Sequence, residues 1–172
     1  WRSYPALSRL AQVAPLDMTE QAFLARCKSL HELWQRLPNG LVRRLIVAAG
    51  HPRKSMKDWG SLKLLQALLN ILERLNGDQE TIEAWGSGVE PDDLTRRNDR
   101  LAPLFFNNQL RIADAHEAVG EVRDALAGFD VDLAELSDGY GRALDRVFDG
   151  VIAALQAVVG ELEALRDRSA RD

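Results

Sequence analysis

Residues 101–129 read LAPLFFNNQLRIADAHEAVGEVRDALAGF, and this stretch predicts one long amphipathic helix. Apolar residues recur in it at steps of three and four, the period that places them on one side of an α-helix. Pro103 suits the first turn, where a backbone N–H has no helical partner, and Gly128 lies where a helix commonly ends. The predicted core-facing stripe consists of Phe105, Ile112, Ala115, Val119, Val122 and Leu126.

The rest of the chain also predicts helices rather than strands. Leucine and alanine dominate its 172 residues, aromatic residues make up 6%, and no run of alternating β-branched residues occurs. Helices are expected over residues 17–37, 41–49, 61–75, 78–85, 91–98 and 138–168, with residues 1–16 as a linker or appendage. The predicted fold is therefore all-α, a helical bundle of about five to seven helices with a long C-terminal helix, in a single helical domain over residues 1–172.

Cysteine content and hydropathy indicate a reducing compartment, and we expect a cytoplasmic location. Cys27 is the single cysteine, so no internal disulfide can form. No apolar run approaches the roughly 20 residues that span a bilayer, and the start has no signal-peptide pattern, so no membrane partner is expected. Because the chain opens with Trp1 rather than methionine, we expect a C-terminal fragment of a larger protein.

Charge is distributed unevenly along the chain, whose net charge is −4. Residues 1–112 carry 16 basic and 12 acidic residues, whereas residues 113–172 carry 6 basic and 14 acidic ones. This distribution argues against uniform nucleic-acid binding and is compatible with a local basic surface.

Two basic clusters are candidates for that surface. Between Glu32 and Asp58 there is no acidic residue, and a basic loop between helices can hold phosphate by Coulomb attraction. The neighbouring Trp59 can stack on a base or pack into the core. The first cluster contains Arg36, Arg43, Arg44, Arg53, Lys54 and Lys57, and the second contains Arg96, Arg97 and Arg100. Of these, Arg53, Lys54, Lys57, Arg96 and Arg97 are the candidate RNA-binding residues, and a solvated face is the alternative for both clusters.

Arg111 and His116, within the letters RIADAH, form the one pair whose spacing hints at catalysis. A histidine with an ordinary pKa near 6.5 can move the proton of a ribose 2′-OH that attacks the neighbouring phosphate. An arginine can neutralise charge on the transition state with a two-pronged donor. Because the two residues lie roughly 140° apart around a helix, a second copy of the helix is needed to bring them together.

This Arg–x4–6–His spacing in an all-helical context resembles the HEPN superfamily, the higher eukaryotes and prokaryotes nucleotide-binding domains. The resemblance implies a four- or five-helix bundle that cleaves RNA without a metal, with Arg111 and His116 as catalytic residues. It also implies a dimer that places two motifs in one cleft, and a role in a toxin or antiviral defence system. In this chain Ile112 follows the arginine, where the family usually has a polar residue.

Other functions remain open. The apolar residues from Val147 to Leu165 predict a non-catalytic interaction module that forms a homodimer or docks to other parts of a larger protein. The basic residues between Arg43 and Lys57 predict a nucleic-acid-binding domain. In either case Arg111 pairs with a carboxylate and His116 caps or packs. No phosphate-loop, zinc or nucleophile motif occurs, so we expect no metal and no cofactor.

Overall fold

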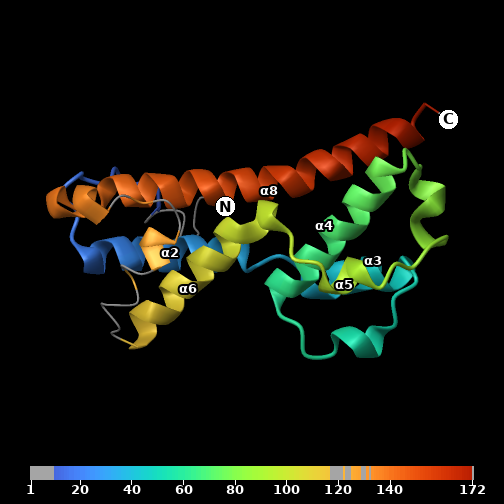
Figure 1. The fold of residues 1–172 in the computed structure, drawn as a ribbon, viewed down its shortest axis with the longest axis horizontal. Coiled ribbons are helices and arrows are strands. Elements are labelled where there is room, and N and C mark those ends of the chain that lie inside the picture. The colour runs from blue at the N-terminus through green and yellow to red at the C-terminus, as the bar shows by residue number, and fades with distance from the viewer. Residues whose placement is uncertain (1–9, 117–121, 123–124, 129–130, 132, 172) are drawn as a thin grey trace. The chain divides into compact units, whose positions relative to one another are not determined.

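The computed structural model describes residues 10–116, 122, 125–128, 131 and 133–171, without the side chains of residues 114–116, 133 and 135. Its α-helices are α2 (Glu20–Trp34), α3 (Asn39–Ala48), α4 (Ser61–Gly77), α5 (Asp92–Thr95), α6 (Ala102–His116) and α8 (Gly141–Ser169), drawn in Figure 1. Short 3-10 helices are η1 (Arg53–Met56), η2 (Ile82–Gly86), η3 (Asp99–Leu101) and η4 (Leu133–Asp138). No strand occurs among the described residues, so the predicted all-α fold with a long C-terminal helix is confirmed.

Packing divides the chain into two compact units. Unit 1 comprises Trp1–Arg36 and Ala102–Ala153, and unit 2 comprises Leu37–Leu101 and Ala154–Asp172. The continuous helix α8 contributes its first part to unit 1 and its last part to unit 2. This division describes internal packing, and the single helical domain over residues 1–172 stays a prediction.

In unit 1, α2 packs against α6. The helix begins after Thr19, whose side-chain oxygen accepts a hydrogen bond from the backbone N–H of Ala22 at 3.3 Å, the usual form of an N-cap. The predicted helix over residues 17–37 is therefore found, with its end at Trp34. Its buried residues are Phe23, Leu24, Cys27, Ser29, Leu30, His31 and Trp34.

The buried side of α6 differs from the predicted stripe. Leu104, Leu110 and Ala113 are buried, whereas Phe105 is half-buried and Ile112 is 38% exposed. The predicted register for this part of the helix was therefore wrong. Of the other predicted members, Val122 and Leu126 are buried, while the side chains of Ala115 and Val119 lie outside the described part of the chain.

A buried asparagine explains the difference. Asn107 is fully buried because both ends of its amide are satisfied: its Oδ1 accepts from Trp34 Nε1 at 2.8 Å, and its Nδ2 donates to the Cys27 carbonyl at 3.0 Å. A hydrogen-bonded amide can occupy a core position at little cost. A pattern of apolar residues cannot reveal such a position, because asparagine normally counts as polar.

The start of α8 lies against the segment that precedes α2. The backbone N–H of Tyr140 donates to the Met18 carbonyl at 2.9 Å, and that of Gly141 donates to the Leu16 carbonyl at 3.2 Å. Gly139 has φ +120°, and a Cβ there would lie 2.4 Å from the Leu16 carbonyl oxygen. Glycine is therefore required at this approach, both for its backbone conformation and for space.

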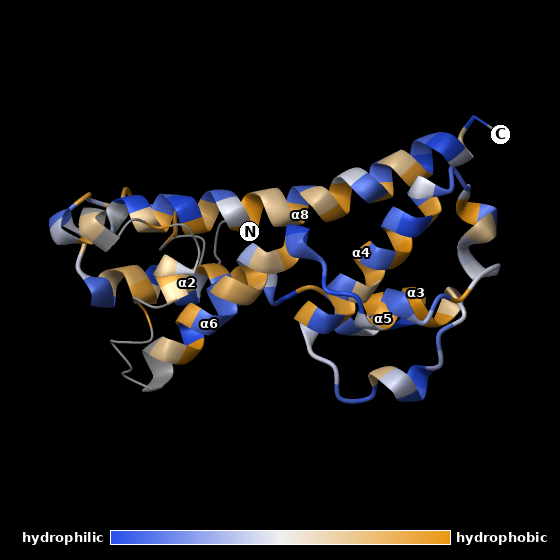
Figure 2. Cartoon of the chain, in the orientation of Figure 1, coloured by the Kyte–Doolittle hydropathy of each residue, from blue (hydrophilic) through white to orange (hydrophobic). Residues whose placement is uncertain are grey.

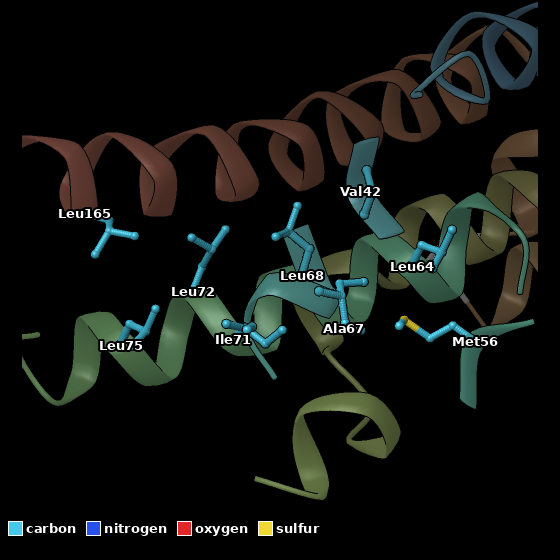
Figure 3. Packing of buried hydrophobic residues seen from close by; sticks show 11 residues of the cluster. Val42, Met56, Leu64, Ala67, Leu68, Ile71, Leu72, Leu75 and Leu165 are labelled. Carbon is cyan, nitrogen blue, oxygen red and sulfur yellow. The ribbon is translucent and has the colours of Figure 1, made fainter. Parts of the chain in front are cut away.

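In unit 2, α4 is the central helix and packs against α3 and α5. Figure 2 shows hydrophobic and hydrophilic residues alternating along it, as expected for an amphipathic helix. Figure 3 shows leucines of α4 in one buried cluster with Val42 of α3 and Leu165 of α8. Those α4 leucines are Leu64, Leu68, Leu72 and Leu75.

The apolar stripe of α8 is largely buried within the chain itself. Val147, Val151 and Val158 are buried, and so is Leu165. Intramolecular packing therefore covers these four residues, whereas Ile152, Val159 and Leu162 of the same stretch are exposed. The predicted use of this stretch to bind a second chain stays a prediction.

Candidate functional site

The candidate site is a hollow of about 300 Å³ in unit 2, beside α3. It is lined by Gly40, Arg43, Arg44, Val47 and Arg53, and we refer to it as the arginine hollow. No acidic side chain is among the described residues that line it. Three arginines, each with a permanently charged guanidinium group, therefore line one small volume.

The sequence of α3 explains why two of these arginines face outward. Four of the lining residues, from Gly40 to Val47, follow the i, i+3, i+4, i+7 spacing that places residues on one side of a helix. Val42 and Ile46 lie between them in sequence and are buried in the core of unit 2. Burial of this apolar side fixes the rotation of α3, so the side with the arginines must face away from the core.

The third arginine reaches the hollow through the turn that follows α3. Gly50 has φ +96°, and a Cβ there would come within 2.5 Å of a neighbouring valine side chain. The next residue, His51, is 2% exposed, and its Nε2 lies 3.2 Å from Asp93 Oδ2. Met56 at the other end of η1 is fully buried. Because both ends of this segment are fixed, Arg53 stays close to α3.

Hydrogen bonding also fixes Arg43. Its Nη2 donates to the Trp59 carbonyl at 3.2 Å, while its Nε is buried and has no hydrogen-bond partner among the described residues. Arg44 and Arg53 are exposed, and no described residue forms an ion pair with them. The exposed guanidinium groups of Arg44 and Arg53 are available to an oxygen acceptor, so this arrangement suits an anion.

The other candidates of the first cluster lie next to the hollow. Lys54 belongs to η1 and Lys57 follows it, and both side chains are exposed. In a 3-10 helix residues three apart lie on the same side, so the two ammonium groups extend the positive surface beyond Arg53. Trp59 is half-buried and packs against the core of unit 2, so it serves the packing role left open by the sequence.

The second cluster carries compensated charge. Glu73 of α4 accepts from two of its arginines, and the third pairs with an exposed aspartate. Ion pairs of this kind leave less charge for a ligand and instead connect α4 with neighbouring segments. The pairs are Arg96–Glu73 at 2.9 Å, Arg97–Asp99 at 3.1 Å, Arg100–Glu73 at 3.1 Å and Arg100–Glu161 at 2.6 Å.

Arg111 lies on α6 in unit 1, half-buried, and its Nε has no hydrogen-bond partner among the described residues. Burial of the imidazole and, next, the positive charge of Arg111 hold the pKa of His31 below its ordinary value of 6.5, although Gln35 and Glu32 act in the opposite direction. The backbone of His116 ends α6, but its side chain lies outside the described part. The charge of Arg111 therefore acts on His31, and the predicted pairing with His116 stays a prediction.

An apolar groove of about 600 Å³ also lies in unit 2. Its wall includes Trp85, whose Nε1 donates to the Leu45 carbonyl at 2.9 Å, and it reaches the last turns of α8. The groove has almost no polar lining and contains none of the predicted site residues. It is lined by Leu45, Ala48, Ile82, Trp85, Leu162, Leu165, Arg166, Ser169 and Ala170.

Sequence reasoning named the arginines of α3 but missed Gly40 and Val47, which complete the hollow with them. The i, i+3, i+4, i+7 spacing of these four residues was the available signal. No spacing in the sequence indicated that Arg53, which lies after α3, lines the same hollow as the arginines of α3. That position of Arg53 depends on the contact between His51 and Asp93, which lie 42 residues apart.

Further observations bear on the kind of protein. Among the described residues, no group of three or more histidines, cysteines, aspartates and glutamates is placed to hold a metal ion, and Cys27 is a buried cysteine that forms no disulfide. None of the described helices combines the length and the apolar character needed to cross a membrane. No family model, curated protein or solved structure matches the chain. The fold and the site define an all-α protein with a hollow lined by three arginines.

Proposed function

We propose that this chain is an RNA-binding helical domain whose binding site is the arginine hollow, and that it cleaves RNA without a metal in the manner of the HEPN superfamily. The observation that carries the proposal is the set of three arginines that line one hollow, with no acidic residue among the described lining residues. Arginine binds the oxygens of phosphate or carboxylate with two parallel hydrogen bonds, so such a site suits an oxyanion such as phosphate.

Single-stranded RNA is the form of nucleic acid that suits this surface. A flexible strand can place one phosphate in a hollow of about 300 Å³ while its neighbours follow the exposed Lys54 and Lys57. A rigid duplex presents phosphates on a broad convex surface, which a small hollow contacts poorly.

The cleavage half of the proposal concerns Arg111 and His116. Support comes from the Nε of Arg111, which is buried and has no partner among the described residues, and which is therefore free to bind an oxygen acceptor. The two residues lie five apart on a helix, so the active form has two copies, with Arg111 of one copy facing His116 of the other.

Binding is tested with fluorescently labelled single-stranded RNA and fluorescence anisotropy. Arg44→Glu reverses one charge of the hollow at an exposed position of α3, and we expect affinity to fall at least about tenfold. Lys63→Glu is the matched control, because it changes net charge equally at an exposed position of α4 that does not line the hollow. Equal loss in the two variants, or no binding by the parent chain, contradicts the binding half of the proposal.

Cleavage is tested by incubating the chain with the same RNA in excess EDTA. We expect cleavage to persist in EDTA and to disappear in Arg111→Ala and in His116→Ala, since the reaction needs a proton carrier and a phosphate ligand but no metal. Light scattering on the same samples establishes the number of copies. A dimer that leaves the RNA intact refutes the cleavage half and leaves the binding half standing.

The alternative function is a non-catalytic interaction module that binds a second copy of itself. Ile152, Val159 and Leu162 favour it, because their seven-then-three spacing is the pattern by which like helices pair. Val159→Asp removes this surface without touching the buried side of α8, so a dimer should become a monomer. A monomer at micromolar concentration in the parent chain excludes the alternative.

A further inference from the structure

The arginine hollow differs from a groove that follows a nucleic-acid backbone. Its three arginines converge on one volume of about 300 Å³, at the lower end of the range for small-molecule sites. An internal phosphodiester carries one negative charge. A phosphate monoester carries between about 1.5 and 2 negative charges at pH 7, because its second pKa is near 6. A concentration of positive charge in one place therefore favours the monoester.

The first turn of α3 adds further donors to the same hollow. Its N-cap residue Pro38 provides no side-chain cap, and no acidic residue occurs in the first turn. No hydrogen bond is formed by the backbone N–H of Asn39 or Gly40 with another described residue. Gly40 lines the hollow, and a Cβ there would meet no atom within 4 Å, so an anion can approach the backbone. Free N–H groups at the positive end of a helix bind phosphate oxygens.

The backbone around the hollow is fixed before any ligand enters. Arg43 donates to the Trp59 carbonyl, and η1 is fixed by the buried His51 at one end and the buried Met56 at the other. A guanidinium group that is already in place, as that of Arg43 is, loses little conformational entropy on binding. A compact dianion gains from such a fixed backbone, because all three arginines are held near one volume.

We propose that the arginine hollow binds the terminal phosphate monoester of an RNA strand, so that the chain recognises strand ends. This inference rests on the proposed RNA binding and specifies which phosphate occupies the site. The exposed Lys54 and Lys57 then contact the diester phosphates that follow the terminal one. A strand with only hydroxyl ends can place no more than a diester phosphate in the hollow, and it therefore lacks the contacts made by the second negative charge.

The test uses one internally labelled RNA 12-mer in three forms: with a 5′-phosphate, with a 3′-phosphate, and with hydroxyls at both ends. We expect one phosphorylated form to bind at least about tenfold more tightly than the hydroxyl form, as the loss of a charge-assisted hydrogen bond implies. The two phosphorylated forms distinguish recognition of a 5′ end from that of a 3′ end. Arg53→Gln should remove the difference in affinity between phosphorylated and hydroxyl RNA, because it loses the charge and keeps a polar side chain. Lys63→Gln should preserve that difference.

The outcomes separate this inference from the proposed function. Equal affinity for all three forms overturns the recognition of strand ends while RNA binding stands, and absence of binding to every form overturns both. A phosphoserine peptide of equal net charge is the remaining probe. If the peptide binds as tightly as phosphorylated RNA, and Arg53→Gln weakens both equally, the assignment of the hollow to RNA is overturned. Circular dichroism of each variant verifies that the helices are intact.

Discussion

At the scale of single residues, Asn107 joins the two helices that form unit 1. Its amide accepts from the Trp34 indole and donates to the Cys27 carbonyl, entirely out of contact with water. Side chains of this kind add specificity to an apolar interface, since a shift of either helix leaves a buried polar group unpaired. The packing of α2 against α6 therefore depends on one polar residue as well as on leucines.

We predict that Asn107→Ala lowers the free energy of unfolding by about 2–3 kcal/mol, because it leaves the Trp34 N–H unpaired in the core and creates a cavity. Asn108→Ala is the matched control, since the neighbouring residue is only half-buried, and it should change the free energy of unfolding by about 0.5 kcal/mol or less. Urea unfolding followed by tryptophan fluorescence measures both. Equal effects would show that the buried amide contributes nothing particular.

A second residue-scale prediction concerns His31 and pH. Its pKa is lowered by burial and by Arg111, so the unfolded chain binds more protons than the folded one below pH 6.5. The free energy of unfolding should therefore fall as pH drops from 6.5 through the lower pKa of the folded state, by at most about 1.4 kcal/mol per pH unit for one proton.

The His31→Gln variant isolates this contribution. It removes the titrating group while retaining a polar side chain of comparable size, so its stability should change less between pH 7 and pH 5.5 than that of the parent. Thermal unfolding at a series of pH values compares the two chains. Parallel curves for parent and variant would assign the acid sensitivity to other groups.

At the scale of elements, the glycines around α8 have opposite consequences for stability. Gly139 has a positive φ and contacts the backbone of residue Leu16, whereas Gly160 lies inside the helix with no atom near its missing Cβ. Gly139 and Gly141 therefore permit a close approach of backbone segments, whereas Gly160 only weakens the helix.

We predict that Gly139→Ala destabilises the chain by more than about 1 kcal/mol, since the added Cβ collides with backbone atoms and the φ is unfavourable for alanine. Gly160→Ala should instead stabilise it by about 0.5–1 kcal/mol, because alanine is the better residue in an exposed helix interior. Melting temperatures of the two variants, measured side by side, provide the comparison. Stabilisation by both substitutions would refute the described contact at Gly139.

Element boundaries were largely predictable, and their buried sides only partly so. The start of α4 at Ser61 and the end of α8 at Ser169 follow from clear apolar periodicity, which is a local property of the sequence. The rotation of α6 was not predictable, because it depends on a long-range hydrogen bond to Trp34. The predicted acidic helix over residues 78–85 is instead the 3-10 helix η2, a distinction too small for propensities to make.

At the scale of the whole molecule, the chain combines a net charge of −4 with one uncompensated basic hollow. An acidic molecule repels nucleic acid in general, so binding should be confined to the arginine hollow and its lysines. The basic residues of this site were visible in the sequence. The convergence of the three arginines on one hollow was not visible in the sequence. It depends on a turn after α3 that is fixed by the contact between His51 and Asp93.

The most direct test of RNA binding at the arginine hollow is the salt dependence of affinity for single-stranded RNA. Each phosphate neutralised contributes a slope of about −0.7 in log K against log salt. Because the arginine hollow holds one phosphate, which carries between one and two negative charges, the account predicts that replacing Arg43, Arg44 and Arg53 by glutamine makes this slope shallower by about 0.7–1.4. An unchanged slope, with the helical circular dichroism of the parent, would contradict it.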